Sequence, residues 1–258
     1  MNKFMYKIGV SRVQIRFSLR STPVFIIFLG NCETNICLLH FKADKFLNFE
    51  LKSLPAPYDE EFSCGFRMVQ IGSKAYVTVS SSDELSQCIE LAFDARHCNG
   101  SLGSQPFKCR ERANLLFARH CHAACSSDND THLVVTGNMP NGDDNSLTKK
   151  AERFDIRRNK WTELPELNVG RSQHSSCSVG SATYVFCGLS SPDWSVLSSI
   201  EKLETSLKAV STSDKSAAAE SAAWKLINLP DMIGRVSLGV ARLNYREVLI
   251  MGGVTDSE

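Results

Sequence analysis

Histidines and cysteines that could bind a metal gather in one short segment, residues 119–125, with the sequence "RHCHAAC". Zinc takes four such ligands in a tetrahedron. In a strand, however, His120 and His122 would point to one face, and Cys121 and Cys125 to the other. Four ligands cannot converge from opposite faces of a strand, so we expect no metal at this segment.

Sequence signatures of nucleotide binding and of nucleophilic catalysis are missing from the chain. Neither G-x-x-x-x-G-K-[ST] nor G-x-G-x-x-G occurs, and "SSCSVGS" does not contain the G-x-S-x-G pattern of a nucleophile elbow. We therefore expect no cofactor and no catalytic residues.

Three arginines, Arg119, Arg171 and Arg235, each precede a segment of small or alternating residues. Guanidinium groups at such recurring positions could bind carboxylates of a partner in a bidentate way. Alternatively, each arginine has a structural role and pairs with a carboxylate or a backbone carbonyl of a neighbouring repeat unit. Trp194 in "SSPDWS" has no aromatic counterpart elsewhere. It is a candidate for a partner-binding hot spot, unless it packs on its own unit.

The composition is that of an ordinary globular protein. Of 258 residues, 43% are hydrophobic and 22% charged, and the formal net charge of +1 points to neither nucleic acid nor membrane partners. No apolar run approaches the ~20 residues of a membrane helix. Ten cysteines occur without a C-x-x-C pair. This usage is typical of a reduced, cytoplasmic chain with cysteine as a small buried residue.

The first residues are basic: residues 1–20 contain five Lys/Arg and no acid. They could form a transit peptide. However, Val13, Ile15, Phe17 and Leu19 alternate with more polar residues, which favours a strand. We expect residues 1–11 to be a lead-in to the folded domain.

A short apolar strand that ends near a glycine recurs about every 50 residues, a period typical of repeat architectures. Each copy is followed by a second strand with an aromatic or leucine centre and by a third with an aromatic and often Leu-Pro. An arginine and a small-residue strand then begin the next unit. One four-stranded sheet cannot bury both faces alone, so the units must stack, and radial stacking gives a β-propeller. The aligned strand positions are Ile27, Val77, Val134, Val185 and Leu249.

The order Arg, small-residue strand, Tyr-x-x-x-Gly, Phe-Asp, Trp and Leu-Pro resembles the kelch-repeat family, most closely in residues 119–167 and 171–232. The family's double glycine stands only at Gly252-Gly253. Its usual tyrosine is present at Tyr76 and Tyr184 but replaced at Leu133 and Val248. The resemblance implies an all-β fold, a kelch-type β-propeller of four-stranded antiparallel blades.

About four and a half blades are expected. The propeller would span residues 12–258, with blades at approximately 12–57, 61–115, 119–167 and 171–232 and a partial blade at 235–258. Because kelch propellers most often have six blades, we expect an incomplete ring. A closed small ring with an irregular last blade is the alternative.

The loops of an antiparallel meander alternate between two ends of the sheet. One end would be rich in acids and the other in bases such as Arg157, Arg158 and Lys160. The acidic end could bind a basic or mixed-charge segment of a protein partner, although solvated loop tips are commonly charged. The candidate partner-binding residues are Asp59, Glu60, Asp83, Asp143, Asp144, Asp193, Trp194, Arg119, Arg171 and Arg235.

A propeller with variable loops suits a non-catalytic scaffold for protein–protein interaction in the cytoplasm. The first alternative is the substrate-recognition subunit of a cullin-type ubiquitin ligase. Many kelch proteins carry a BTB domain ahead of the propeller, and repeats beginning near residue 12 leave no room for one. The other alternative is a propeller enzyme, since some kelch-like proteins are enzymes.

Overall fold

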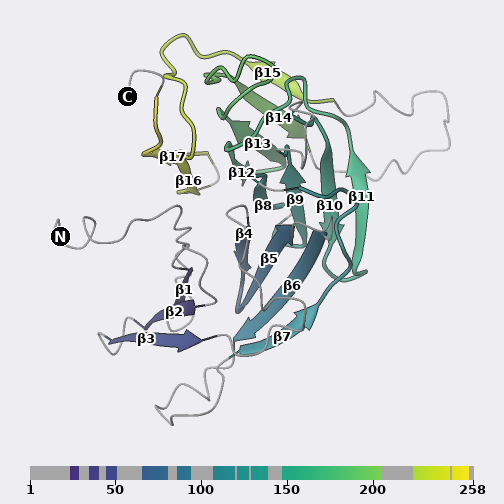
Figure 1. Cartoon of the computed structure of the whole chain (residues 1–258), viewed down its shortest axis with the longest axis vertical. Coiled ribbons are helices and arrows are strands. Elements are labelled where there is room, and N and C mark those ends of the chain that lie inside the picture. The colour runs from purple at the N-terminus through teal and green to yellow at the C-terminus, as the bar shows by residue number, and fades with distance from the viewer. Residues whose placement is uncertain are drawn as a thin grey trace.

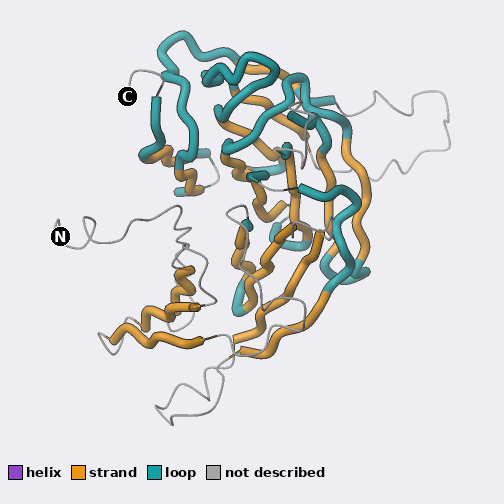
Figure 2. The backbone as a smooth tube through the Cα atoms, in the orientation of Figure 1, coloured by secondary structure: helices purple, strands orange, loops and turns teal. Residues whose placement is uncertain are grey.

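The computed structural model describes strands at residues 24–28, 35–40 and 45–50, and then residues 66–80, 86–93, 107–119, 121–127, 129–138, 147–204, 223–244 and 246–255. In these ranges the chain forms strands joined by turns and loops, as Figure 2 shows, and no helix. Accordingly, none of the described residues belongs to a helix capable of crossing a membrane. The expected strand at residues 13–19 and the lead-in at residues 1–11 lie outside the described residues.

The strands of the described residues form five antiparallel sheets, and in each of these sheets consecutive strands are neighbours. Three of the sheets have four strands, which confirms the expectation of an all-β chain with four-stranded antiparallel sheets. The first sheet contains β1 (Val24–Phe28), β2 (Asn35–His40) and β3 (Lys45–Glu50). The second contains β4 (Arg67–Ile71), β5 (Lys74–Ser80), β6 (Ser86–Phe93) and β7 (Phe107–Glu111). The third contains β8 (Ala123–Ser127), β9 (His132–Thr136), β10 (Ala151–Asp155) and β11 (Lys160–Leu164). The fourth contains β12 (Ser175–Val179), β13 (Ala182–Phe186), β14 (Ile200–Glu204) and β15 (Lys225–Ile227), and the last contains β16 (Gly239–Arg242) and β17 (Val248–Met251).

Successive sheets meet through their first strands. Strand β4 contacts β8, β8 contacts β12, and β12 contacts β16. Figure 1 shows these strands on the inner side of an arc, with β7 and β11 on its outer side. The inner strands β8 and β12 have the sequences AACSS and SSCSV. Small side chains are needed there because the sheets converge on one another at the inner side.

The hydrophobic core lies between neighbouring sheets. Between the second and third sheets, the ring centroid of Phe154 lies 6.4 Å from that of Tyr76 and 4.9 Å from that of Trp161. The indole N–H of Trp161 donates to the carbonyl of Ala113 at 2.8 Å. Trp224 of the fourth sheet likewise donates to the carbonyl of Pro165 at 2.8 Å. Each outer tryptophan thus fills the core and ties its sheet to the chain that enters it.

Glycine ends the second strand of a sheet because another backbone passes close by. Gly137 follows β9 with a φ of 65°, and a Cβ placed there would lie 2.2 Å from the carbonyl oxygen of Arg171. Gly188 follows β13 with a φ of 97°, and its Cβ would lie 2.5 Å from the carbonyl oxygen of Ser172. The positive φ and the close approach both exclude a side chain at these positions.

Candidate functional site

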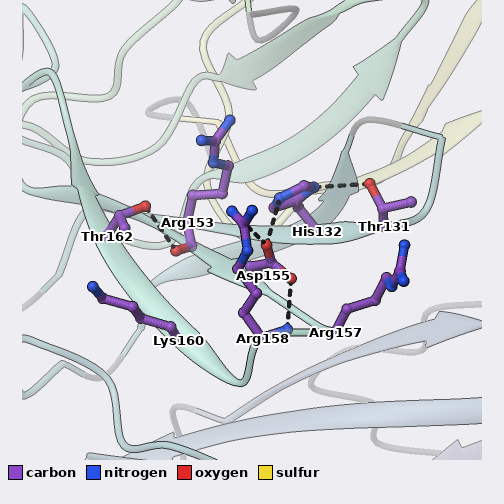
Figure 3. A pocket seen from close by; sticks show the side chains of 8 residues that line it. All are labelled: Thr131, His132, Arg153, Asp155, Arg157, Arg158, Lys160 and Thr162. Carbon is purple, nitrogen blue, oxygen red and sulfur yellow. Dashed lines mark hydrogen bonds and ion pairs between the residues drawn. The ribbon is translucent and has the colours of Figure 1, made fainter.

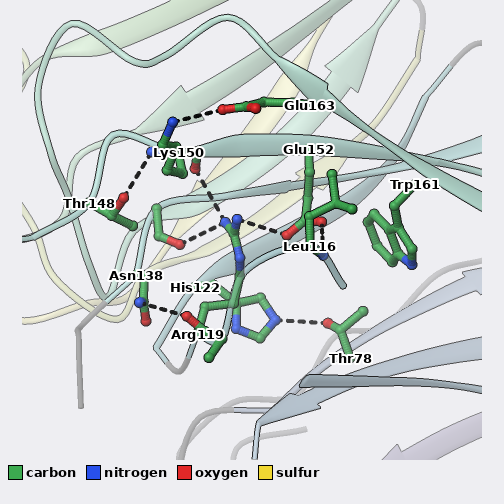
Figure 4. Close-up of polar contacts among 12 residues, drawn as sticks. Thr78, Leu116, Arg119, His122, Asn138, Thr148, Lys150, Glu152, Trp161 and Glu163 are labelled. Carbon is green, nitrogen blue, oxygen red and sulfur yellow. Dashed lines mark hydrogen bonds and ion pairs between the residues drawn. The ribbon is translucent and has the colours of Figure 1, made fainter. Parts of the chain in front are cut away.

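Arg119 and Arg171 lie inside the framework, in the segments that lead into β8 and β12. Their Nη2 atoms are 2.7 Å from Oε1 of Glu152 and of Glu201, respectively, and all four side chains are fully buried. Arg119 also donates from Nη1 to the carbonyl of Gly137 at 3.0 Å and to that of Lys150 at 3.2 Å. Figure 4 shows the Arg119 guanidinium between Glu152 and Lys150. Each guanidinium therefore joins the entering segment of its sheet to the middle strands of the same sheet.

The two glutamates hold the same entering segments from the other side. Oε2 of Glu152 accepts the backbone N–H of Leu116 at 2.7 Å. Glu201 accepts the backbone N–H groups of Asn168 at 2.7 Å and of Val169 at 3.1 Å. Burial raises the pKa of Glu152, and the Arg119 guanidinium and the backbone N–H groups act against this rise. We call each of these two sets, an arginine with its glutamate, a buried clamp.

The expectation that Arg119 and Arg171 belong to an exposed partner-binding face is corrected by these contacts. A fully buried guanidinium that already binds a carboxylate is not available to a partner. The alternative of a structural role describes both residues, but the carboxylate belongs to the same sheet and not to a neighbouring one. Arg235 occupies the corresponding place before β16, and its Nη1 donates to the carbonyl of Gly252 at 3.2 Å. Within the described ranges we find no carboxylate paired with Arg235.

A histidine of the segment 119–125, which was considered above as a metal site, links two sheets. Nε2 of His122 lies 2.8 Å from Oγ1 of Thr78 on β5. His174 repeats this contact with Oγ1 of Thr136 on β9, at 2.9 Å. Both histidines precede their strands, and both are buried. No group of three or more His, Cys, Asp or Glu in the described part of the chain could hold a metal ion, and His120 lies outside that part.

Asp193 and Trp194 lie in the loop that joins β13 to β14. Oδ1 of Asp193 accepts hydrogen bonds from Oγ of Ser190 at 3.0 Å and from Oγ of Ser195 at 3.1 Å. A hydrogen bond from the backbone N–H of Ser195 lowers the pKa of Asp193, which favours its ionised form. We call residues 190–195 the Trp194 loop.

The Trp194 loop is anchored to three parts of the framework. Leu189, just before it, exchanges both backbone hydrogen bonds with Ser172. The backbone N–H of Gly188 donates to the carbonyl of Arg235 at 2.9 Å. The hydroxyl of Ser191 accepts the N–H of Leu147 at 2.9 Å. The loop and the two residues before it are thereby hydrogen-bonded to the segments that precede β10, β12 and β16.

Trp194 itself has a φ of 55° and is partly exposed. A bulky residue in the left-handed region is uncommon and persists only when the surrounding structure enforces it. The hydrogen bonds of Asp193 on one side and of Ser195 on the other provide this enforcement. The remaining candidates from the sequence, Asp59, Glu60, Asp83, Asp143 and Asp144, lie outside the described residues.

A depression of about 920 Å³ lies at one end of the third sheet, near the β8–β9 and β10–β11 turns. Figure 3 shows Asp155 at its centre with basic side chains spread around it. We call it the basic depression. Its charged lining consists of Arg153, Arg157, Arg158, Lys160 and Asp155, and its uncharged polar lining of Thr131, His132 and Thr162.

The sequence placed Arg157, Arg158 and Lys160 at this end of the sheet but did not select them as a site. Arg153 and His132 were not identified at all. Their common location follows from the strand register, in which Asp155 is opposite both His132 and Lys160. In "RFDI" the charged residues Arg153 and Asp155 alternate with Phe154 and Ile156, a pattern that could have placed Arg153 and Asp155 on one face; it carries no signal for His132.

Comparisons with known proteins give a fold and no function. No family model matches the chain, and no curated protein does. The solved structure of YjhT is similar, with a TM-score of 0.51 and 11% sequence identity. The similarity covers 70% of this chain and 55% of YjhT, so the chain spans little more than half of that protein. At such low identity the similarity concerns the fold alone.

Proposed function

We propose that the chain is an open kelch-type β-propeller that binds protein partners through its loops and has no catalytic role. The contacts between the first strands of successive sheets support the radial arrangement. The repetition of buried clamps, of strand-ending glycines and of tryptophan-to-carbonyl bonds supports the repeat assignment. The similarity to YjhT is consistent with a fold of this kind.

The observation that carries the proposed function is the Trp194 loop. It presents an aromatic side chain on a loop that is hydrogen-bonded, through Ser191 and through Gly188 and Leu189 just before it, to the segments that precede β10, β12 and β16. Tryptophan is enriched among the few residues that supply most of the binding free energy of protein interfaces. A fixed loop also loses little conformational entropy when a partner binds.

The partner of this loop is a basic or mixed-charge protein segment. Asp193 is exposed, its lowered pKa favours the ionised form, and it directly precedes Trp194 in the chain. A lysine or arginine of the partner can therefore approach a carboxylate and an aromatic ring at once. We place this interaction in the cytoplasm, because the six described cysteines are free thiols.

The Trp194→Ala variant tests the proposal. The purified chain and the variant are immobilised, and proteins retained from native cell extract are quantified by mass spectrometry. We expect the variant to retain about one tenth or less of the amount of each specific partner that the parent chain retains. The reason is that truncating a hot-spot residue lowers the binding free energy by about 2 kcal/mol or more.

The matched control is Arg110→Ala, which removes a long exposed side chain from β7, away from the loop. Both variants should melt like the parent chain in circular dichroism. Retention of the same partners by Trp194→Ala would remove the proposed role of the loop.

A further inference from the structure

The basic depression lies on one face of the third sheet, and that face changes character along the strands. Ala151 on this face of β10 packs with Val185, Leu203 and Trp224 of the fourth sheet. Arg153 and Asp155 follow Ala151 on the same face of β10, because alternate residues of a strand share a face. The face is thus apolar where the next sheet covers it and basic beyond that contact.

The fold does not require these charges. The opposite face of the same strands supplies the hydrophobic core through Leu133, Phe154 and Trp161, all of them buried. Short-range turn chemistry accounts only for Asp155, whose Oδ1 accepts the backbone N–H of Arg158 at 2.8 Å. That hydrogen bond lowers the pKa of Asp155 and favours its ionised form.

The carboxylate of Asp155 is shared among the groups around it. Its Oδ2 lies 3.7 Å from Nε2 of His132 and 3.6 Å from Nη1 of Arg158. Four basic residues line the depression against this one acid. Arg157 and Lys160 are exposed, and for neither side chain do the described residues supply an ion-pair partner. The depression therefore has an excess of positive charge and of hydrogen-bond donors.

We propose that the basic depression binds a phosphorylated serine or threonine in a segment of a partner protein. A phosphoryl group carries nearly two negative charges at neutral pH and three strong acceptor oxygens. Guanidinium groups bind such oxygens in a bidentate way, and clusters of arginines recognise phosphorylated motifs in this manner. Charge complementarity is the property that selects this occupant.

This site is separate from the Trp194 loop. The basic depression adjoins the β8–β9 and β10–β11 turns, whereas the Trp194 loop follows the second strand of its sheet. In an antiparallel meander these connections lie at opposite ends of the sheets. The two sites can therefore be tested independently, and the failure of one leaves the other intact.

Fluorescence anisotropy provides the test, with the full chain and a labelled Gly/Ser peptide that carries two phosphoserines. The unphosphorylated peptide is the reference. We expect saturable binding of the phosphorylated peptide only, weakening as salt is added, because exposed charges are screened. The double variant Arg157→Glu/Lys160→Glu should weaken binding by at least about tenfold, since two attractions become repulsions.

The matched control is the double variant Lys149→Glu/Arg242→Glu, which makes the same change of charge on exposed residues just before β10, at the opposite end of that strand, and on β16. We expect it to bind the phosphorylated peptide within about twofold of the parent chain, because distant exposed charges are screened by salt. An equal loss in both double variants would overturn the proposal, since binding would then follow net charge alone.

Two further arms separate other sources of negative charge. Inorganic phosphate in excess should compete with the peptide only weakly, and strong competition would identify a free-phosphate site instead. Binding to vesicles that contain phosphatidylserine, together with no binding of the phosphorylated peptide, would identify a membrane surface and would overturn the proposal. Equal binding of the phosphorylated and unphosphorylated peptides would do the same.

Discussion

Replacing Glu152 by glutamine should strongly destabilise the protein. The side chain keeps its size and one carbonyl oxygen, but Arg119 becomes a buried cation without its counterion. In the structure the two groups are 2.7 Å apart, and neither side chain is exposed. Breaking a fully buried ion pair by removing one partner costs about 3–5 kcal/mol. Because the free energy of unfolding of a native protein is about 5–15 kcal/mol, Glu152→Gln should remove a large part of it.

Urea denaturation followed by circular dichroism measures this loss as a shift of the midpoint. The control is Glu163→Gln, which removes an ion pair at the surface. Oε1 of Glu163 lies 2.7 Å from Nζ of Lys150, and the side chains are 49% exposed for Glu163 and 36% exposed for Lys150. Such a surface pair is worth about 1 kcal/mol or less. A double variant, Arg119→Met/Glu152→Leu, should be less destabilised than Glu152→Gln because it leaves no lone buried charge.

If Glu152→Gln lost no more stability than Glu163→Gln, the buried clamp would not hold the entering segment to its sheet. The reasoning would also be refuted if the double variant lost more stability than the single one. In that case the geometry of the hydrogen bonds, and not the isolated charge, would decide the stability.

Three further predictions follow from local geometry and from shifted pKa values. In urea denaturation, Gly137→Ala should lower the free energy of unfolding by about 2 kcal/mol more than Gly180→Ala does. Both glycines have a positive φ, but only at Gly137 does other backbone lie within 4 Å of the added Cβ. Equal losses of stability in the two variants would contradict this prediction. Burial raises the pKa of Cys88 to about 12, so iodoacetamide at neutral pH should label this thiol only after denaturant is added, as peptide mass spectrometry can detect. Labelling of Cys88 in the native chain would show that it is accessible. The pKa of Asp155 is lowered, chiefly by the backbone N–H of Arg158, so its contribution to stability should be present above its ordinary value of 3.8 and lost only as the pH falls through the lower folded value. An NMR titration of this carboxyl with a midpoint at or above 3.8 would show that the hydrogen bond does not favour the ionised form.

The strand order could be predicted from the sequence because its signals are local. In the sequence, β13 lies in an apolar run that ends at Gly188, and β12 lies in a run of small alternating residues after Arg171. Such periodicity depends only on the pleat and on the turns, which neighbouring residues determine. The four-stranded antiparallel sheets were therefore foreseeable.

The role of the repeat arginines could not be predicted with the same certainty. Arg119 meets Glu152 only after β10 pairs with β9 and the segment before β8 folds back onto the sheet. No short-range pattern links the two residues. The signal that was available is the recurrence of a glutamate in the third strand of the second, third and fourth sheets, at Glu90, Glu152 and Glu201.

The basic depression was missed for a different reason. The sequence located its turn residues, but Arg153 and His132 belong to strands and reach the same face through the register of β9 with β10. The Trp194 loop was identified by type alone, since an unrepeated tryptophan stands out against the other units. Its fixed conformation depends on contacts with Ser172, Leu147 and Arg235, which come from other parts of the chain.

Site-specific photo-crosslinking tests directly whether this protein binds protein partners through the Trp194 loop. A benzophenone amino acid replaces Trp194 in one sample and Arg110 in the other, and both samples are irradiated in native cell extract. We expect covalent adducts with discrete proteins from position 194 and none of these from position 110. The same adducts from both positions, or none from position 194, would contradict this expectation.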